Sequence, residues 1–107
     1  MTSLSLADHI FSEREPTAKP EWIAEILSRL VWLTADNGAG ICHALRQWLA
    51  GENEEKAAVA LAFDEVFLWS TETEMKGILS NVEAKFPGLV PMCVVARKRW
   101  KAQFGEA

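Results

Sequence analysis

The chain has 107 residues, of which 50% are hydrophobic and 24% are charged, and its formal net charge is −4. This length predicts one domain, residues 1–107, that can bury a core without disulfides or metals. The acidic balance argues against a general nucleic-acid binder, and no apolar run approaches the roughly 18 residues of a membrane span.

The N-terminal region predicts a short helix followed by a stiff connector. Residues 3–13 place several apolar side chains, Ile10 and Phe11 among them, on one helical face. Pro16 and Pro20 then fix two backbone φ angles, which favours a connector over a regular element. We therefore expect residues 1–19 to form an N-terminal arm and a proline-containing connector. The first residues lack the basic start of a secretory signal.

Residues 20–34 predict the central helix of the domain. Pro20 suits the first helical position, where a missing N–H costs nothing, and the pair Asn37-Gly38 is a stop signal. Trp32 falls on the polar half of the helix, so either a neighbouring segment covers it or it anchors a partner. The opposite half is apolar on a wheel of about 100° per residue. Its members are Trp22, Ile23, Ile26, Leu27, Leu30, Val31 and Leu33.

Two further helices follow. The first carries one apolar stripe over about three turns and ends at Gly51. Asn53 can cap the second, which we expect to run over residues 54–69 and to be apolar on two sides. A helix of that kind is sandwiched between layers, so we place it at the centre of the fold beside residues 20–34. Asp64 lies between the two apolar sides of this predicted helix, where we expect its carboxylate to be solvated.

The last third of the chain predicts two more helices. Thr71 and Glu74 fit a capping box at the start of one helix, and Pro87-Gly88 ends it. Pro91 suits the start of the other helix, whose apolar residues share a narrow arc. These residues are Cys93, Ala96, Trp100 and Phe104. Together the elements predict an all-α fold, a compact bundle of five to six short helices in a single domain.

Charge is distributed unevenly along the chain. Residues 51–86 carry eight acids and three bases, net −5, whereas residues 87–107 carry one acid and four bases, net +3. Bases near a helix C-terminus complement the helix dipole, which accounts for them without a ligand. The run RKRWK also interleaves an aromatic ring with bases, as in phosphate contact combined with stacking. Trp100 shares its stripe with Cys93, however, which favours a place in the core.

The sequence carries no motif for catalysis or for cofactor binding. The turn at residues 37–40 is not a phosphate-binding glycine loop. Cys42 and His43 point about 100° apart on a helix and cannot close on one metal ion. Cys42 and Cys93 make no disulfide framework, so we expect buried free thiols and a reducing, cytoplasmic location. We therefore predict no enzyme, no cofactor and no metal.

These features favour a small, non-enzymatic protein-binding module, such as a bacterial or mobile-element accessory, inhibitor or immunity-like protein. It would act by occupying the surface of a partner. An acidic face steers association with a basic partner, for example a nuclease or a nucleic-acid-handling complex. The predicted contact residues are Trp32, Glu52, Glu54, Glu55, Glu72 and Glu74.

Two alternatives remain open. The first is a nucleic-acid-associated regulator that uses the basic C-terminal helix through Arg97, Lys98, Arg99 and Lys101. The second is an obligate homodimer with a structural role, in which surplus apolar surface pairs with a second copy. That surface would comprise Trp32, Leu61, Leu68 and Trp69.

Overall fold

The computed structural model describes residues 3–64 and 67–104, and every regular element in that part of the chain is a helix. The predicted all-α fold is therefore confirmed. The helices are α1 (Ser3–Ser12), α2 (Pro20–Val31), α3 (Ala39–Ala50), α4 (Glu54–Ala62), α5 (Glu72–Lys85), the 3₁₀ helix η1 (Pro87–Leu89) and α6 (Val90–Phe104).

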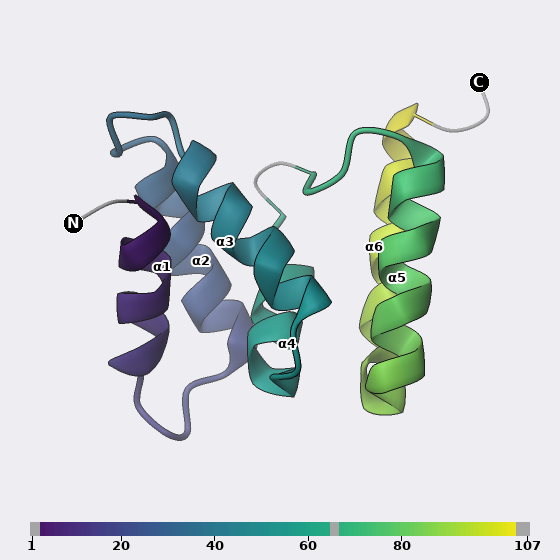
Figure 1. Ribbon diagram of the computed structural model, residues 1–107, viewed down its shortest axis with the longest axis horizontal. Coiled ribbons are helices and arrows are strands. Elements are labelled where there is room, and N and C mark those ends of the chain that lie inside the picture. The colour runs from purple at the N-terminus through teal and green to yellow at the C-terminus, as the bar shows by residue number, and fades with distance from the viewer. Residues whose placement is uncertain (1–2, 65–66, 105–107) are drawn as a thin grey trace.

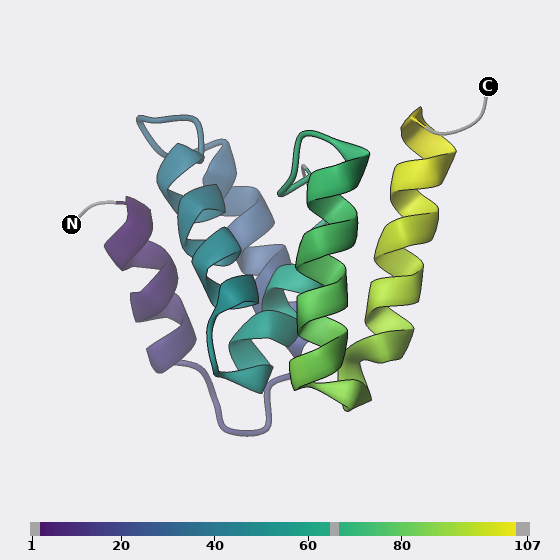
Figure 2. The ribbon, with the colours of Figure 1, turned by 45° about the vertical axis from the view of Figure 1, so that its right-hand side comes forward.

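The helices form two groups in space. Helices α1 to α4 pack together, and α5 and α6 lie side by side as an antiparallel pair (Figure 1, Figure 2). The groups are joined by contacts of α3 with α5 and of α4 with α6. The Cα radius of gyration is 13.3 Å, close to the roughly 13 Å of a folded domain of this size. None of the helices in the described ranges combines the length and the hydrophobicity that a membrane crossing requires.

Helices α3 and α4, rather than α2, occupy the centre. Residues 57–61 of α4 are all buried, and α3 contacts α1, α2, α4 and α5. Helix α2 buries only one side, formed by Ile23, Ala24, Leu27 and Val31. The prediction that residues 20–34 lie at the centre is therefore wrong. The prediction fails because α4 covers one side of α2, while the opposite side faces outward.

Helices α2 and α4 run parallel. Pro20 and Glu55, near the starts of the two helices, line one small crevice. Trp32 and Ala62, at their ends, line another. The end of α2 is therefore placed beside the end of α4.

The N-terminal helix is held by buried rings and by one carboxylate. Phe11 is buried, and its ring centroid lies 5.4 Å from that of Trp48 in α3. The Nε1–H of Trp48 donates to Asp8 Oδ1 at 3.0 Å, and Lys56 Nζ lies 3.4 Å from the same oxygen. Asp8 thus connects α1 to both central helices.

A tight turn links α2 to α3, and α2 ends at Val31, earlier than predicted. Asn37 and Gly38 have φ angles of 56° and 83°. The Asp36 carboxylate accepts the N–H groups of Gly38 and Gly40, each at 3.0 Å. A Cβ atom at Gly38 would lie 2.7 Å from Val31 Cγ1. Glycine is required here both for the left-handed backbone and for the close packing.

Helix α4 is shorter than predicted. It ends at Ala62 instead of residue 69, and Phe63 has an extended backbone with φ −71° and ψ 117°. On a continuous helix Phe63 and Leu68 would point about 140° apart. Leaving the helix lets both side chains, and that of Trp69, become buried in the same core. The predicted helix also covered residues 65–66, which lie outside the described residues.

The predicted helix caps are present, with one change of partner. Asn53 Oδ1 accepts the N–H of Lys56 at 2.9 Å. Thr71 Oγ1 accepts the N–H of Glu74 at 3.1 Å, whereas the Glu74 carboxylate accepts the N–H of Ser70 at 2.7 Å instead of that of Thr71. Both caps satisfy N–H groups that a helix start leaves unpaired.

A two-bond ion pair joins α6 to α5. Arg97 donates to both carboxylate oxygens of Glu83, at 2.6 and 2.8 Å. The buried residues of α6 are only Cys93 and Ala96, both small. Val94 and Val95, on the side of α6 away from Cys93, are exposed.

Candidate functional site

Exposed hydrophobic side chains mark two surfaces of the molecule. Among the described residues, the large hydrophobic side chains that are more than a third exposed lie either on α2 and the two residues after it or on α6. Surplus apolar surface of this kind, when contiguous, is typical of interaction sites.

The first surface is the outward side of α2. Trp22 is 56% exposed, Ile26 44%, Trp32 65% and Leu33 77%. Trp22, Ile26 and Leu33 were predicted to face the core, and that prediction is wrong. Trp22 and Ile26 lie about 40° apart on the helical wheel, beside the buried arc that contains Leu27, and Leu33 follows two residues after the helix ends. The apolar half of the helix is wider than α4 can cover.

A groove runs along the neighbouring face of α2, between that helix and the end of α4. Its volume is about 500 Å³. Three carboxylates line it, those of Glu21, Glu25 and Asp64, together with the guanidinium of Arg29 and the ring of Trp32. Arg29 pairs with Glu25 at 3.3 Å. Two of the three negative charges in the groove therefore have no counter-charge within it.

We call this combined surface the α2 face. It consists of the apolar stripe Trp22, Ile26 and Leu33 and of the adjacent acidic groove that contains Trp32. Trp32 is placed at the C-cap of α2, where no described helix buries it, so it belongs to the surface rather than to the core.

The predicted acidic rim does not form one surface. Glu52, Glu54 and Glu55 stand around the start of α4, whereas Glu72 and Glu74 lie in the first turn of α5. Lys85 at the far end of α5 lies 3.5 Å from Glu52. The two groups are thus separated by about the length of α5, roughly 20 Å at 1.5 Å per residue.

Most of these acids also have partners within the chain. Glu55 pairs with Arg14 at 2.9 Å, and Glu72 with Lys76 at 3.4 Å. Moreover, Trp32 is placed beside the end of α4, not beside the start where Glu54 and Glu55 lie. The structure therefore does not bring Trp32 together with the acids that were predicted to accompany it.

The acids that do accompany Trp32 were missed in the sequence, although a signal was present. Glu21, Glu25, Ser28 and Trp32 follow one another at intervals of three or four residues, which places them on one helical face. Asp64 carried no such signal, because its position depends on where α4 ends.

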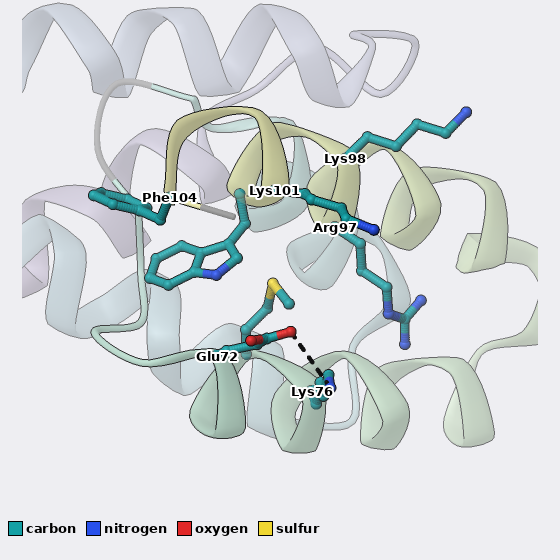
Figure 3. Close-up of a pocket in the computed structure, with 8 residues that line it drawn as sticks. Glu72, Lys76, Arg97, Lys98, Lys101 and Phe104 are labelled. Atoms are coloured by element: carbon teal, nitrogen blue, oxygen red, sulfur yellow. Dashed lines mark ion pairs between the residues drawn. The ribbon is translucent and has the colours of Figure 1, made fainter. Parts of the chain in front are cut away.

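The second surface is a cleft of about 660 Å³ between the first turns of α5 and the last turns of α6. Figure 3 shows Phe104 at one end, Arg97 at the other and Lys101 between them, with the Glu72–Lys76 ion pair along the α5 side. Three of the four predicted basic residues, Arg97, Lys98 and Lys101, line it. The remaining lining residues are Glu72, Met75, Lys76, Trp100 and Phe104.

The fourth predicted base, Arg99, lies elsewhere, with its guanidinium 5.6 Å from the ring centroid of Phe67. Arg97 is already paired with Glu83. The hydrogen bonds from Arg97 hold the pKa of the Glu83 carboxyl below its usual value, and the same pairing raises the pKa of Arg97. Among the described residues, Lys98 and Lys101 have no ion-pair partner, so they supply the uncompensated positive charge.

The apolar surplus predicted for a homodimer is largely absent. Leu61, Leu68 and Trp69 are 5%, 3% and 8% exposed, so they belong to the core and are not a surface for a second copy. That prediction is wrong for these three residues: Leu61 is buried within α4, and Leu68 and Trp69 turn inward after the chain leaves the helix at Phe63. Of the predicted set, only Trp32 is on the surface.

Neither cysteine is activated. Burial raises the pKa of the Cys93 thiol to about 11, and burial also raises the pKa of Cys42, which is only partly buried. Both thiols are free. Within residues 3–64 and 67–104, no three histidine, cysteine, aspartate or glutamate side chains are close enough to hold a metal ion.

Comparisons with known proteins add nothing to this geometry. No protein-family model matches the chain, and neither curated proteins nor solved structures give a match. The function must therefore be argued from the two surfaces.

Proposed function

We propose that the protein is a non-enzymatic binding module whose α2 face occupies the surface of a partner protein. The observation that carries this proposal is the pair of exposed tryptophans, Trp22 and Trp32, on one short helix. Exposing two such rings to water is unfavourable for a monomer, and tryptophan is enriched among the residues that dominate binding energy.

The charge of the α2 face indicates the chemistry of the partner. Glu21 and Asp64 make no ion pair with the described residues and lie in the same groove as Trp32. A lysine or arginine side chain of a partner could lie between these carboxylates and against the indole ring, where a cation–π contact adds to the ion pairs. The stripe of Trp22, Ile26 and Leu33 would cover apolar residues next to that basic side chain.

This arrangement supports a partner with a basic and apolar patch, and an inhibitor or accessory that blocks such a patch by shape and charge. The acids in contact are then Glu21, Glu25 and Asp64. Glu52, Glu54, Glu55, Glu72 and Glu74 act at longer range by adding to the negative field that steers association.

The test is quantitative affinity capture from the native cell extract with three baits. These are the wild-type chain, the double variant Trp22→Ala/Trp32→Ala, and Phe104→Ala as a matched exposed aromatic on α6. We expect a basic protein that the wild type and Phe104→Ala retain and that the double variant loses. Thermal melting should show that the double variant remains folded, because both rings are more than half exposed.

The captured partner is then titrated against Glu21→Gln/Asp64→Asn. Removing two charges that lie within a contact should weaken binding about tenfold or more and reduce its salt dependence. A partner retained equally by the wild type and by both double variants would contradict the proposal. A double variant that unfolds would instead place the two tryptophans among the stabilising contacts.

A further inference from the structure

The cleft between α5 and α6 has features that the α2 face does not explain. It lies on the other group of helices, and its lining bases contrast with an acidic chain of net charge −4. Its volume of about 660 Å³ is within the range of small-ligand sites. Its two ends also differ in chemistry.

One end of the cleft is aromatic. The ring centroids of Trp100 and Phe104 are 4.5 Å apart, and Phe67 lies 5.2 Å from Trp100 on the inner side. Phe104 is nevertheless 58% exposed. The inner rings therefore support Phe104 while leaving part of it open. An exposed ring with support behind it is a platform on which a flat ligand group can stack.

The rest of the cleft carries positive charge. Arg97 is fixed by Glu83, and Lys76 is paired with Glu72. Lys98 and Lys101 keep their charge uncompensated among the described residues. Lys101 lies between the aromatic end and Arg97, and Lys98 extends outward from the same helix (Figure 3). A ligand stacked on Phe104 would therefore meet Lys101 first and Lys98 further along.

We propose that this cleft binds a short stretch of single-stranded nucleic acid, with an unpaired base stacked on Phe104 and the following phosphates on Lys101 and Lys98. An acidic peptide would use the lysines but leave the aromatic platform empty. A double helix offers no free base face to the ring. The two unpaired lysines on an acidic chain make the binding weak and strongly dependent on salt.

The proposal is tested by fluorescence anisotropy with a labelled oligothymidylate at low salt. The wild type should bind at micromolar protein. Lys98→Gln/Lys101→Gln should weaken binding, and for a single strand the loss of two phosphate contacts should flatten the salt dependence by about 1.4 in the log–log slope. Phe104→Leu keeps an apolar side chain but removes the ring, and should weaken binding roughly fivefold or more.

Two control variants separate this cleft from the α2 face. Arg46→Glu reverses the charge of an exposed base on α3 that does not line the cleft, and Trp32→Ala removes the ring of the other surface. Both should bind the oligonucleotide as the wild type does. If Trp32→Ala fails in protein capture but binds the oligonucleotide normally, the two surfaces act independently.

Competitors identify the ligand class. Unlabelled single strand should displace the probe, while a duplex of equal length, poly-glutamate and a thymidine mononucleotide should not compete at the same concentration. Equal displacement by poly-glutamate would assign the cleft to an acidic peptide, and equal displacement by the mononucleotide to a small metabolite. Either result overturns the proposal, as does the absence of binding at low salt or unchanged binding by Phe104→Leu and the lysine variant.

Discussion

Helices α2 and α6 expose comparable hydrophobic side chains, but they are attached to the molecule by different means. Helix α2 inserts Ile23, Leu27 and Val31 into the core, together with Ala24. Helix α6 buries only the small residues Cys93 and Ala96, and the ion pair between Arg97 and Glu83 and the contacts of Trp100 and Phe104 with Phe67 add to its attachment. An apolar anchor is insensitive to pH and salt, whereas an ionic one is not. Part of the attachment of α6 is therefore sensitive to pH and salt, whereas the attachment of α2 is not.

The largest effect should come from the buried side of α2. Leu27 is 0% exposed, so Leu27→Ala should lower the free energy of unfolding by about 2–5 kcal/mol through lost burial and a residual cavity. Leu33→Ala, two residues after the end of α2 and 77% exposed, should change it by less than about 0.5 kcal/mol. Urea denaturation of both variants checks the difference. Equal losses would show that α2 is not anchored on one side.

The ionic anchor of α6 should give a smaller, pH-dependent effect. Glu83→Gln should lower the free energy of unfolding at neutral pH by about 1 kcal/mol, since Glu83 and Arg97 are joined by two charged hydrogen bonds in a partly buried place.

The sign of the pH dependence follows from the Glu83 pKa. Because the folded pKa is lowered from the usual value of 4.5, the stabilisation is fully present above that value and is lost as the pH falls through the lowered pKa. The wild type should therefore lose more stability than Glu83→Gln on acidification below about pH 5. If the free energy of unfolding changed with pH in the same way for the two proteins, this ion pair would not help to hold α6 in place.

Helix α5, on which α6 packs, should be easy to stabilise. A Cβ atom at Gly77 would meet nothing within 4 Å, and Gly77 lies inside a helix. Gly77→Ala should raise the free energy of unfolding by about 0.5–1 kcal/mol, because alanine loses less backbone entropy on folding. Thermal melting measures the gain. A loss of stability would mean that another molecule packs against α5 at Gly77 in solution.

The smallest effect concerns thiol chemistry rather than stability. With a pKa of about 11, Cys93 would be ionised in only about one molecule in a thousand at pH 8. Its labelling by a maleimide-type or disulfide reagent should therefore be much slower than that of the partly exposed Cys42, and should track the opening of α6 from α5. Mass spectrometry of the labelled peptides distinguishes the sites. Equally rapid labelling in the folded protein would show that α6 is not packed as described.

The local signals of the sequence predicted local structure well. Pro20, Asn53 and Thr71 begin helices where their chemistry places them, since a cap depends only on neighbouring residues. The end of α4 could not be predicted in the same way. No glycine or proline marks it, and the chain leaves the helix because Phe63 and Leu68 gain burial in a core formed by distant helices.

The candidate sites were predictable only in part. The wheel separated Trp32 from the apolar half of its helix, but it could not tell which part of that wide half would remain uncovered. The acidic rim was inferred from charge alone, whereas ion pairs such as Glu55 with Arg14 join residues far apart in the sequence. Such pairings depend on how helices are arranged, and a one-dimensional charge count does not contain that information.

The close contact at Gly38 has a consequence for how variants of this protein are interpreted. A side chain there would push against Val31, and Val31 is the residue next to Trp32. A side chain at Gly38 would therefore displace Val31, the buried last residue of α2. A mutational scan that scores binding would therefore single out Gly38 because its substitution disturbs the packing at the end of α2, and not because Gly38 meets the partner.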